Sequence, residues 1–154
     1  GKVSRRDAVR WVVIEEPEMG LHPQAIEAFL IIVLELMRRG YRVVISTHSP
    51  VVLDLLWAIR TIQELDGMED DVRRFLSLKS SAFTKELCKS ALGKNYRAFY
   101  FSREGVSRDI STLDPSHEDP AISNWGYLTG FSSRASEVIS EIALRKSLGD
   151  ILDV

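Results

Sequence analysis

Two adjacent carboxylates and a histidine stand at the ends of two apolar runs in this chain. Glu15 and Glu16 close the run 11–14, and His48 follows the run 41–45 after two hydroxyl residues. Placing two carboxylates side by side at the end of an apolar strand is costly unless a cation or a polar ligand meets them. A carboxylate can also accept a proton, and an imidazole can contact a phosphate. The residue types therefore suit a hydrolytic or ligand-binding site.

The elements that must position these groups are two strands joined by a helix. Apolar runs without alternation predict strands at 11–15 and 42–46 that are buried on both faces of a parallel sheet. Pro23 at the first helical position and Gly40 as a left-handed stop bound the connecting helix. Because such a crossover is right-handed and makes the strands parallel, their carboxyl ends meet at one edge, where open α/β sheets bind ligands.

The remainder of the chain predicts further helices and one hairpin. Ser49 and Pro50 open a helix after the second strand, and residues 68–94 form two short helices. Residues 97–102 and 106–112 form a β-hairpin. Ser132 or Ser133 is expected to cap a last amphipathic helix, with Ala135, Val138, Ile139, Ile142 and Leu144 as its apolar residues. The predicted class is α/β: a mostly parallel sheet flanked by helices, with a C-terminal β-hairpin and helix.

The two strand ends resemble motifs of one ATPase family. Residues 14–18, Ile-Glu-Glu-Pro-Glu, are similar to a Walker B motif with its catalytic glutamate. Residues 19–23 resemble a D-loop, and residues 46–50, Ser-Thr-His-Ser-Pro, resemble a switch histidine loop. Over roughly residues 8 to 60 the chain resembles the C-terminal half of an ABC-class ATPase head of the RecF, SMC and OLD-like kind. The resemblance implies a partial P-loop NTPase domain that binds ATP and Mg²⁺ and works in DNA repair or anti-phage defence.

The resemblance also implies roles for individual residues. Glu15 would meet Mg²⁺, usually through water, although the family more often has Asp at this position. Glu16 would be the general base that orients the attacking water, and His48 would sense the γ-phosphate. The other residues expected to bind the nucleotide or to face it across a dimer are Gly20, Leu21, His22, Ser46 and Thr47. Glu18 is expected to cap the following helix or to line the dimer face.

Two family motifs are missing from the 154 residues. A Walker A motif needs a glycine-rich turn after a strand, and no segment fits that pattern. Residues 1 to 10 are polar, with no signature motif, and are expected to be a linker or a cut end. We therefore expect a single partial ATPase domain over residues 1–154. Its parts would be a core at 1–66, a helical basic segment at 67–94, and the hairpin with the last helix at 95–154. A Walker A lobe would come from elsewhere, and the heads would form a homodimer.

The basic segment is a candidate nucleic-acid contact, although such a run is more often a solvated face. Its cations are Arg73, Arg74, Lys79, Lys85, Lys89 and Lys94. Of these, Arg73, Arg74, Lys85 and Lys89 are the expected contacts.

Composition gives few further clues to function. A net charge of −2 is not that of a wholesale nucleic-acid binder. A single cysteine, Cys88, suits a reducing compartment. The longest apolar run is too short to span a bilayer, so we expect a soluble, cytoplasmic protein without membrane contact.

Two alternatives to the ATPase hypothesis stay open. In the first, the chain is a non-catalytic interaction or regulatory module derived from such a head, which the lack of a Walker A motif favours. In the second, more remote alternative, the glutamates and histidines of the strand ends hold a catalytic metal ion for another hydrolysis. The spacing of these residues gives the second alternative no support, since Glu15 and Glu16 would project to opposite sides of their strand.

Overall fold

The computed structural model describes residues 10–152, with the side chains of Pro23 and of residues 146–152 left out. Most of the linker expected at residues 1–10 therefore lies outside the described residues. The chain divides into two compact units, one ending at Arg97 and the other beginning at Ala98. The expectation of a single ATPase-like domain stays a prediction, and each unit is described by itself below.

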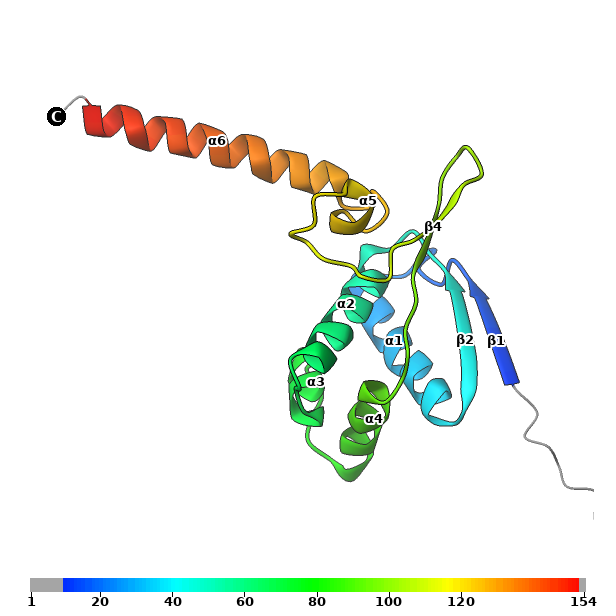
Figure 1. Ribbon diagram of the computed structural model, residues 1–154. Helices are drawn as coiled ribbons and strands as arrows, with labels where there is room; N and C mark the ends of the chain where they lie inside the picture. The colour runs from blue at the N-terminus through cyan, green and yellow to red at the C-terminus, as the bar shows by residue number, and fades with distance from the viewer. Residues whose placement is uncertain (1–9, 153–154) are drawn as a thin grey trace, which may run out of the picture. The chain divides into compact units, whose positions relative to one another are not determined.

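The first unit is built on a parallel pair of strands. β1 spans Arg10–Glu15 and β2 spans Tyr41–Ser46, and Glu15 lies opposite Ser46 in the register. The helix α1, Pro23–Arg38, connects the strands and packs against β2 (Figure 1). The predicted strand–helix–strand unit is thus confirmed. Gly40 has the positive φ of +89° that was expected at the end of the helix.

Three more helices complete the first unit. They are α2, Pro50–Glu64, α3, Glu69–Phe75, and α4, Ala82–Leu92, as predicted. Ser49 is the N-cap of α2, although its side chain makes no capping hydrogen bond. The core joins α1, α2 and α4 through Ile26, Leu30, Leu34, Val52, Leu55, Ile59, Leu87, Ala91 and Tyr96.

Two side chains of the α4 region show how dry this core is. Cys88 is fully buried, and burial raises the pKa of its thiol. Tyr96 is also buried, and its hydroxyl donates a hydrogen bond to the carbonyl oxygen of Ala91 at 2.8 Å. Burial raises the pKa of Tyr96 as well. Both groups are therefore held in their neutral forms by the packing of the helices.

The strands are buried on one face only, so the prediction of burial on both faces is wrong. Along both strands exposed residues alternate with partly buried ones. Val13 is 75% exposed and Val44, opposite it in the register, is 46% exposed. Beside them, the Arg42 guanidinium lies over the Trp11 ring. Within the described residues, no third strand pairs with β1, and its outer edge is open.

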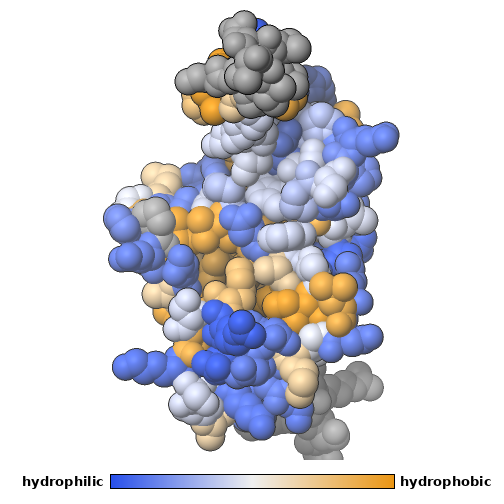
Figure 2. Space-filling view, turned by 90° about the vertical axis from the view of Figure 1, so that its left-hand side faces the viewer, coloured by the Kyte–Doolittle hydropathy of each residue, from blue (hydrophilic) through white to orange (hydrophobic). Residues whose placement is uncertain are grey.

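The outer surface of the helices also carries apolar groups. On the side of the molecule where α3 lies, hydrophobic residues form patches among hydrophilic ones (Figure 2). Leu65, at the end of α2, and Met68, before α3, are both well exposed. None of the described helices has the length and apolar character that crossing a membrane requires.

The second unit contains the predicted hairpin and a long helix. β3, Phe99–Phe101, pairs antiparallel with β4, Ser107–Asp109, and a short helix α5 spans Pro120–Ser123. Gly126 has φ +65° and lies so close to the Tyr100 ring that a side chain here would clash. The packing of this turn therefore requires a glycine.

The last helix departs from two expectations. α6 spans Gly130–Leu152, so it begins two to three residues before the expected cap at Ser132 or Ser133. The sequence predicts an amphipathic helix here, but its apolar residues Val138, Ile139, Ile142 and Leu144 are exposed.

Candidate functional site

The side chains at the strand ends converge as predicted. The backbone N–H of Glu16 donates to the carbonyl oxygen of Ser46 at 2.9 Å, which continues the parallel ladder one residue beyond β1. From there the Glu16 carboxylate reaches the loop after β2. The Nε2 atom of His48 lies 3.3 Å from Oε1 of Glu16, with the two side chains 78% and 38% exposed. The pair is therefore formed and still accessible to a ligand from solvent.

The backbone of Glu16 explains how its carboxylate is aimed. Glu16 has φ +43°, in the left-handed region that residues other than glycine rarely adopt. This conformation ends the alternation of the strand and starts a tight turn, in which the Met19 N–H donates to the Glu16 carbonyl at 3.1 Å. Because the chain turns here, Glu16 does not continue the side-to-side pattern of β1.

The three residues expected to face a partner lie at the start of α1. Gly20 has φ +77°, and Leu21 and His22 are exposed. His22 is the N-cap of α1, and its Nδ1 atom accepts a hydrogen bond from the Gln24 N–H at 3.4 Å. His22 therefore has a structural role in addition to any contact with a nucleotide or a second head.

Glu18 has a role that the sequence did not indicate. It does not cap α1; instead its Oε1 atom accepts hydrogen bonds from the Thr47 hydroxyl at 2.9 Å and from the backbone N–H of His48. The Thr47 hydroxyl in turn accepts from the Ser49 N–H at 2.9 Å. Desolvation of the Glu18 carboxyl opposes its ionisation, but the hydrogen bonds from His48 and Thr47 outweigh it and lower the pKa of Glu18.

The donor set at this edge suits a hard cation. Glu15 and Glu16 supply carboxylate oxygens and Ser46 a hydroxyl, and Mg²⁺ prefers one or two carboxylates together with waters and phosphate oxygens. The residues present therefore fit Mg²⁺ bound together with a nucleotide. Within the described part of the chain, no group of three or more His, Cys, Asp and Glu is placed to hold a metal ion by itself. That finding gives no support to the metal-dependent hydrolase.

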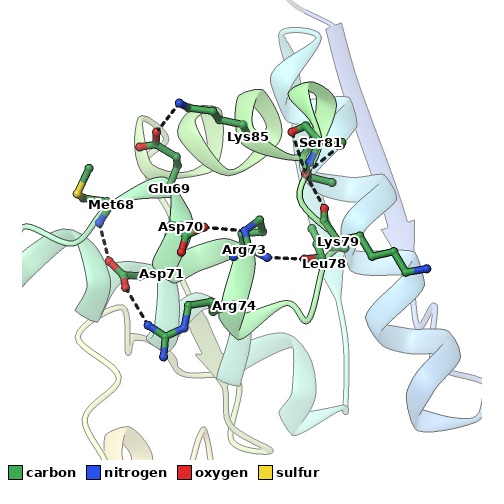
Figure 3. A network of polar contacts seen from close by, with 11 residues as sticks. Met68, Glu69, Asp70, Asp71, Arg73, Arg74, Leu78, Lys79, Ser81 and Lys85 are labelled. Carbon is green, nitrogen blue, oxygen red and sulfur yellow. Dashed lines mark hydrogen bonds and ion pairs between the residues drawn. The ribbon is translucent and has the colours of Figure 1, made fainter.

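Three of the six cations of the basic segment pair with carboxylates of the same segment. Arg73 donates to Asp70 at 2.7 Å and also to the Leu78 carbonyl oxygen at 2.8 Å (Figure 3). Lys85 lies 3.6 Å from Glu69. Arg74 lies 3.9 Å from Asp71. These local pairs reduce the positive charge that the segment could offer to a phosphate backbone. Nucleic-acid contact through Arg73, Arg74, Lys85 and Lys89 stays a prediction.

Comparison with known proteins gives two partial matches, both consistent with the strand-end motifs. Residues 3–54 match the family described as "AAA domain, putative AbiEii toxin, Type IV TA system". The chain is also 35% identical over 92 residues to the Old nuclease of Escherichia phage P2. That alignment covers 59% of this chain and 15% of the nuclease, so the chain spans a small part of that relative. No solved structure matches the chain.

These similarities support an ATPase-like domain in the first unit. The matched range, residues 3–54, contains β1, α1 and β2, together with Glu15, Glu16 and His48. The α/β architecture of this unit is consistent with a P-loop NTPase-like domain, although its sheet has only two strands.

Proposed function

We propose that the first unit supplies the catalytic strand ends of an ATP-hydrolysing head, with Glu15 and Glu16 as its Walker B residues. The observation that carries the proposal is the placement of Glu16 and His48 at one sheet edge, 3.3 Å apart, although they are far apart in the sequence. The match of residues 3–54 to an AAA family and the similarity to the Old nuclease support the same function. The pathway would be DNA repair or defence against phage.

Each side chain at the edge has a distinct task in this proposal. Glu15 would hold the hydrated Mg²⁺ that, when bound, neutralises charge on the phosphates. Glu16 would accept the proton of the attacking water, for which its carboxylate must lie within hydrogen-bond reach of that water. His48 would hold the Glu16 carboxylate in place and contact the γ-phosphate. Ser46 and Thr47 would line the nucleotide.

Two further parts are needed for turnover. Most of the binding affinity for the nucleotide phosphates comes from the backbone amides and the lysine of a Walker A motif. This chain lacks that motif. A lobe with that motif would pair with the open edge of β1. It would also cover the exposed face of the two strands, on which Val13 and Val44 lie. A second head would approach Gly20, Leu21 and His22.

The test is to measure ATP binding and hydrolysis in two contexts. The isolated chain should neither bind nor hydrolyse ATP appreciably, because it lacks the amides and the lysine of a Walker A motif. Joined to an ATPase lobe that carries Walker A and signature motifs, it should hydrolyse ATP. Glu16→Gln keeps the size and hydrogen bonding of the side chain but removes the base, so binding should persist while turnover falls by about 10²–10⁴-fold. His48→Ala should also impair turnover.

Glu27→Gln is the matched control, because Glu27 is an exposed glutamate on α1 and not one of the strand-end residues. It should leave both binding and turnover unchanged. If the completed protein hydrolyses ATP equally well with Glu16→Gln, Glu16 is not the base. If the completed protein binds ATP but the unsubstituted chain supports no hydrolysis, the non-catalytic module is the correct interpretation.

A further inference from the structure

Glu18 joins two segments that are 29 residues apart. It lies in the turn after β1, and its Oε1 atom accepts hydrogen bonds from Thr47 and from the backbone N–H of His48 in the loop after β2. The other carboxylate oxygen, Oε2, is buried and finds no hydrogen-bond partner among the described residues. Burying an unsatisfied carboxylate oxygen is unfavourable. Such a cost at a strand end indicates a constraint other than stability.

The contacts of Glu18 hold the start of the loop after β2, at residues 47 and 48. The Thr47 hydroxyl that donates to Glu18 also accepts from the N–H of Ser49, the N-cap residue of α2. The carboxylate therefore restrains the loop residue before His48 and the backbone of His48 itself. The Thr47 hydroxyl is thus the acceptor for the Ser49 N–H, while the Ser49 side chain itself caps no N–H of the first turn of α2.

We propose that Glu18 is a positioning residue, which fixes the 47–48 backbone so that the His48 imidazole meets the Glu16 carboxylate. Glu16 and Glu18 belong to the same turn, since the Met19 N–H donates to the Glu16 carbonyl and the Leu21 N–H donates to the Glu18 carbonyl. One carboxylate of the turn thus holds the backbone of His48, while the other faces its ring at 3.3 Å. The catalytic consequence of this inference rests on the proposed function.

The direct test is hydrogen exchange of the His48 backbone amide in the full chain, measured by NMR. Glu18→Ala removes the acceptor, and a hydrogen bond to a charged group protects an amide by roughly 10- to 100-fold. Exchange of the His48 amide should accelerate by that factor, while amides of the α1 and α2 core should keep their rates. Glu27→Gln, the exposed control on α1, should change neither set.

A second pair of variants isolates the link through Thr47 and decides the matter if Glu18→Ala does not fold. Thr47→Val keeps the shape but removes the hydroxyl, so it should raise the exchange rate of the His48 and Ser49 amides. Thr47→Ser restores the hydroxyl and should restore protection. Unchanged protection of the His48 amide in Glu18→Ala would overturn the inference; if Glu18→Ala is unfolded, unchanged protection of the Ser49 amide in Thr47→Val would do so.

The catalytic consequence is tested separately in the completed protein. Misplacing one reacting group costs on the order of 10²-fold in rate. Glu18→Ala should therefore lower kcat by roughly 10- to 100-fold with little change in KM for ATP, whereas a general loss of folding would lower the active fraction and the melting temperature together. A normal kcat in a Glu18→Ala protein whose His48 amide exchanges faster would also overturn the inference. An inactive unsubstituted protein whose His48 amide depends on Glu18 would instead count against the proposed function alone.

Discussion

The exposed face of β1 and β2 should make the isolated chain self-associate, and Val13→Lys should prevent it. Val13 is 75% exposed and Val44, opposite it, 46% exposed. Fully burying a valine side chain is worth about 1.5–3 kcal/mol, so covering Val13 would contribute about 1–2 kcal/mol for each copy. Two copies related by symmetry would gain about 2–4 kcal/mol from this residue alone.

Lysine at this position removes that gain, and charged residues at exposed strands are a common protection against edge pairing. Losing about 2–4 kcal/mol weakens a dimer by at least ~30-fold in Kd. Sedimentation velocity over a dilution series measures this directly. The unsubstituted chain should shift from monomer to a larger species as concentration rises, and Val13→Lys should stay monomeric over the same range.

Leu65→Lys is the matched control, because Leu65 is 76% exposed but lies at the end of α2 rather than on a strand. A lysine in this position also suits the carboxyl end of a helix. It should leave self-association unchanged. A clean monomer at high concentration, or a loss of association in Leu65→Lys but not in Val13→Lys, would refute the reasoning.

Three further predictions concern the helices. Leu87→Ala, at a fully buried core position, should lower the free energy of unfolding by about 2–5 kcal/mol in denaturant titration, whereas Phe83→Ala, half exposed on the same helix, should cost much less. Hydrogen bonds from Arg38 and Arg39 lower the pKa of Glu35 to about 2. The ionised Glu35 carboxylate should therefore stabilise the fold above the pKa it has in the unfolded chain, and this stabilisation should be lost as pH falls toward 2. An NMR titration that gives Glu35 the pKa of an ordinary glutamate would contradict this. If the basic segment binds DNA, Lys85→Glu with Lys89→Glu should flatten the salt dependence of binding; no binding, or no change, would make it a solvated face.

In the first unit, the order of the strands and helices and the ends of α1 and α2 could be predicted from the sequence, because local signals mark them. Pro23, Gly40 and Pro50 stand at helix ends, and the two β-branched runs pair in parallel as a crossover requires. The meeting of Glu16 and His48 followed from the same topology. These features depend on neighbouring residues or on one well-determined connection.

Features that depend on distant packing could not be predicted. An apolar run indicates that a strand can be buried on both faces. Whether Val13 is covered depends on another element that packs on it, and the sequence of the strand alone does not show whether such an element is present. The reach of Glu18 to the loop after β2 depends on the rotation of the turn, not on its spacing from Glu15. Similarly, Arg73 and Lys85 pair with Asp70 and Glu69 at the start of the same basic segment, and the composition of the segment does not show that these side chains meet.

The left-handed backbone of Glu16 has a consequence for how such a chain would change over evolutionary time. A side chain in this conformation costs about 1 kcal/mol or more relative to glycine, and the extra freedom of glycine in the unfolded chain offsets only part of it. Selection for folding alone therefore favours glycine at position 16, and only selection for chemistry keeps a carboxylate. In a lineage that retains the fold as a scaffold and loses turnover, replacement of this carboxylate by glycine would therefore no longer be opposed. The identity of residue 16 among relatives is thus a record of whether the activity is still under selection.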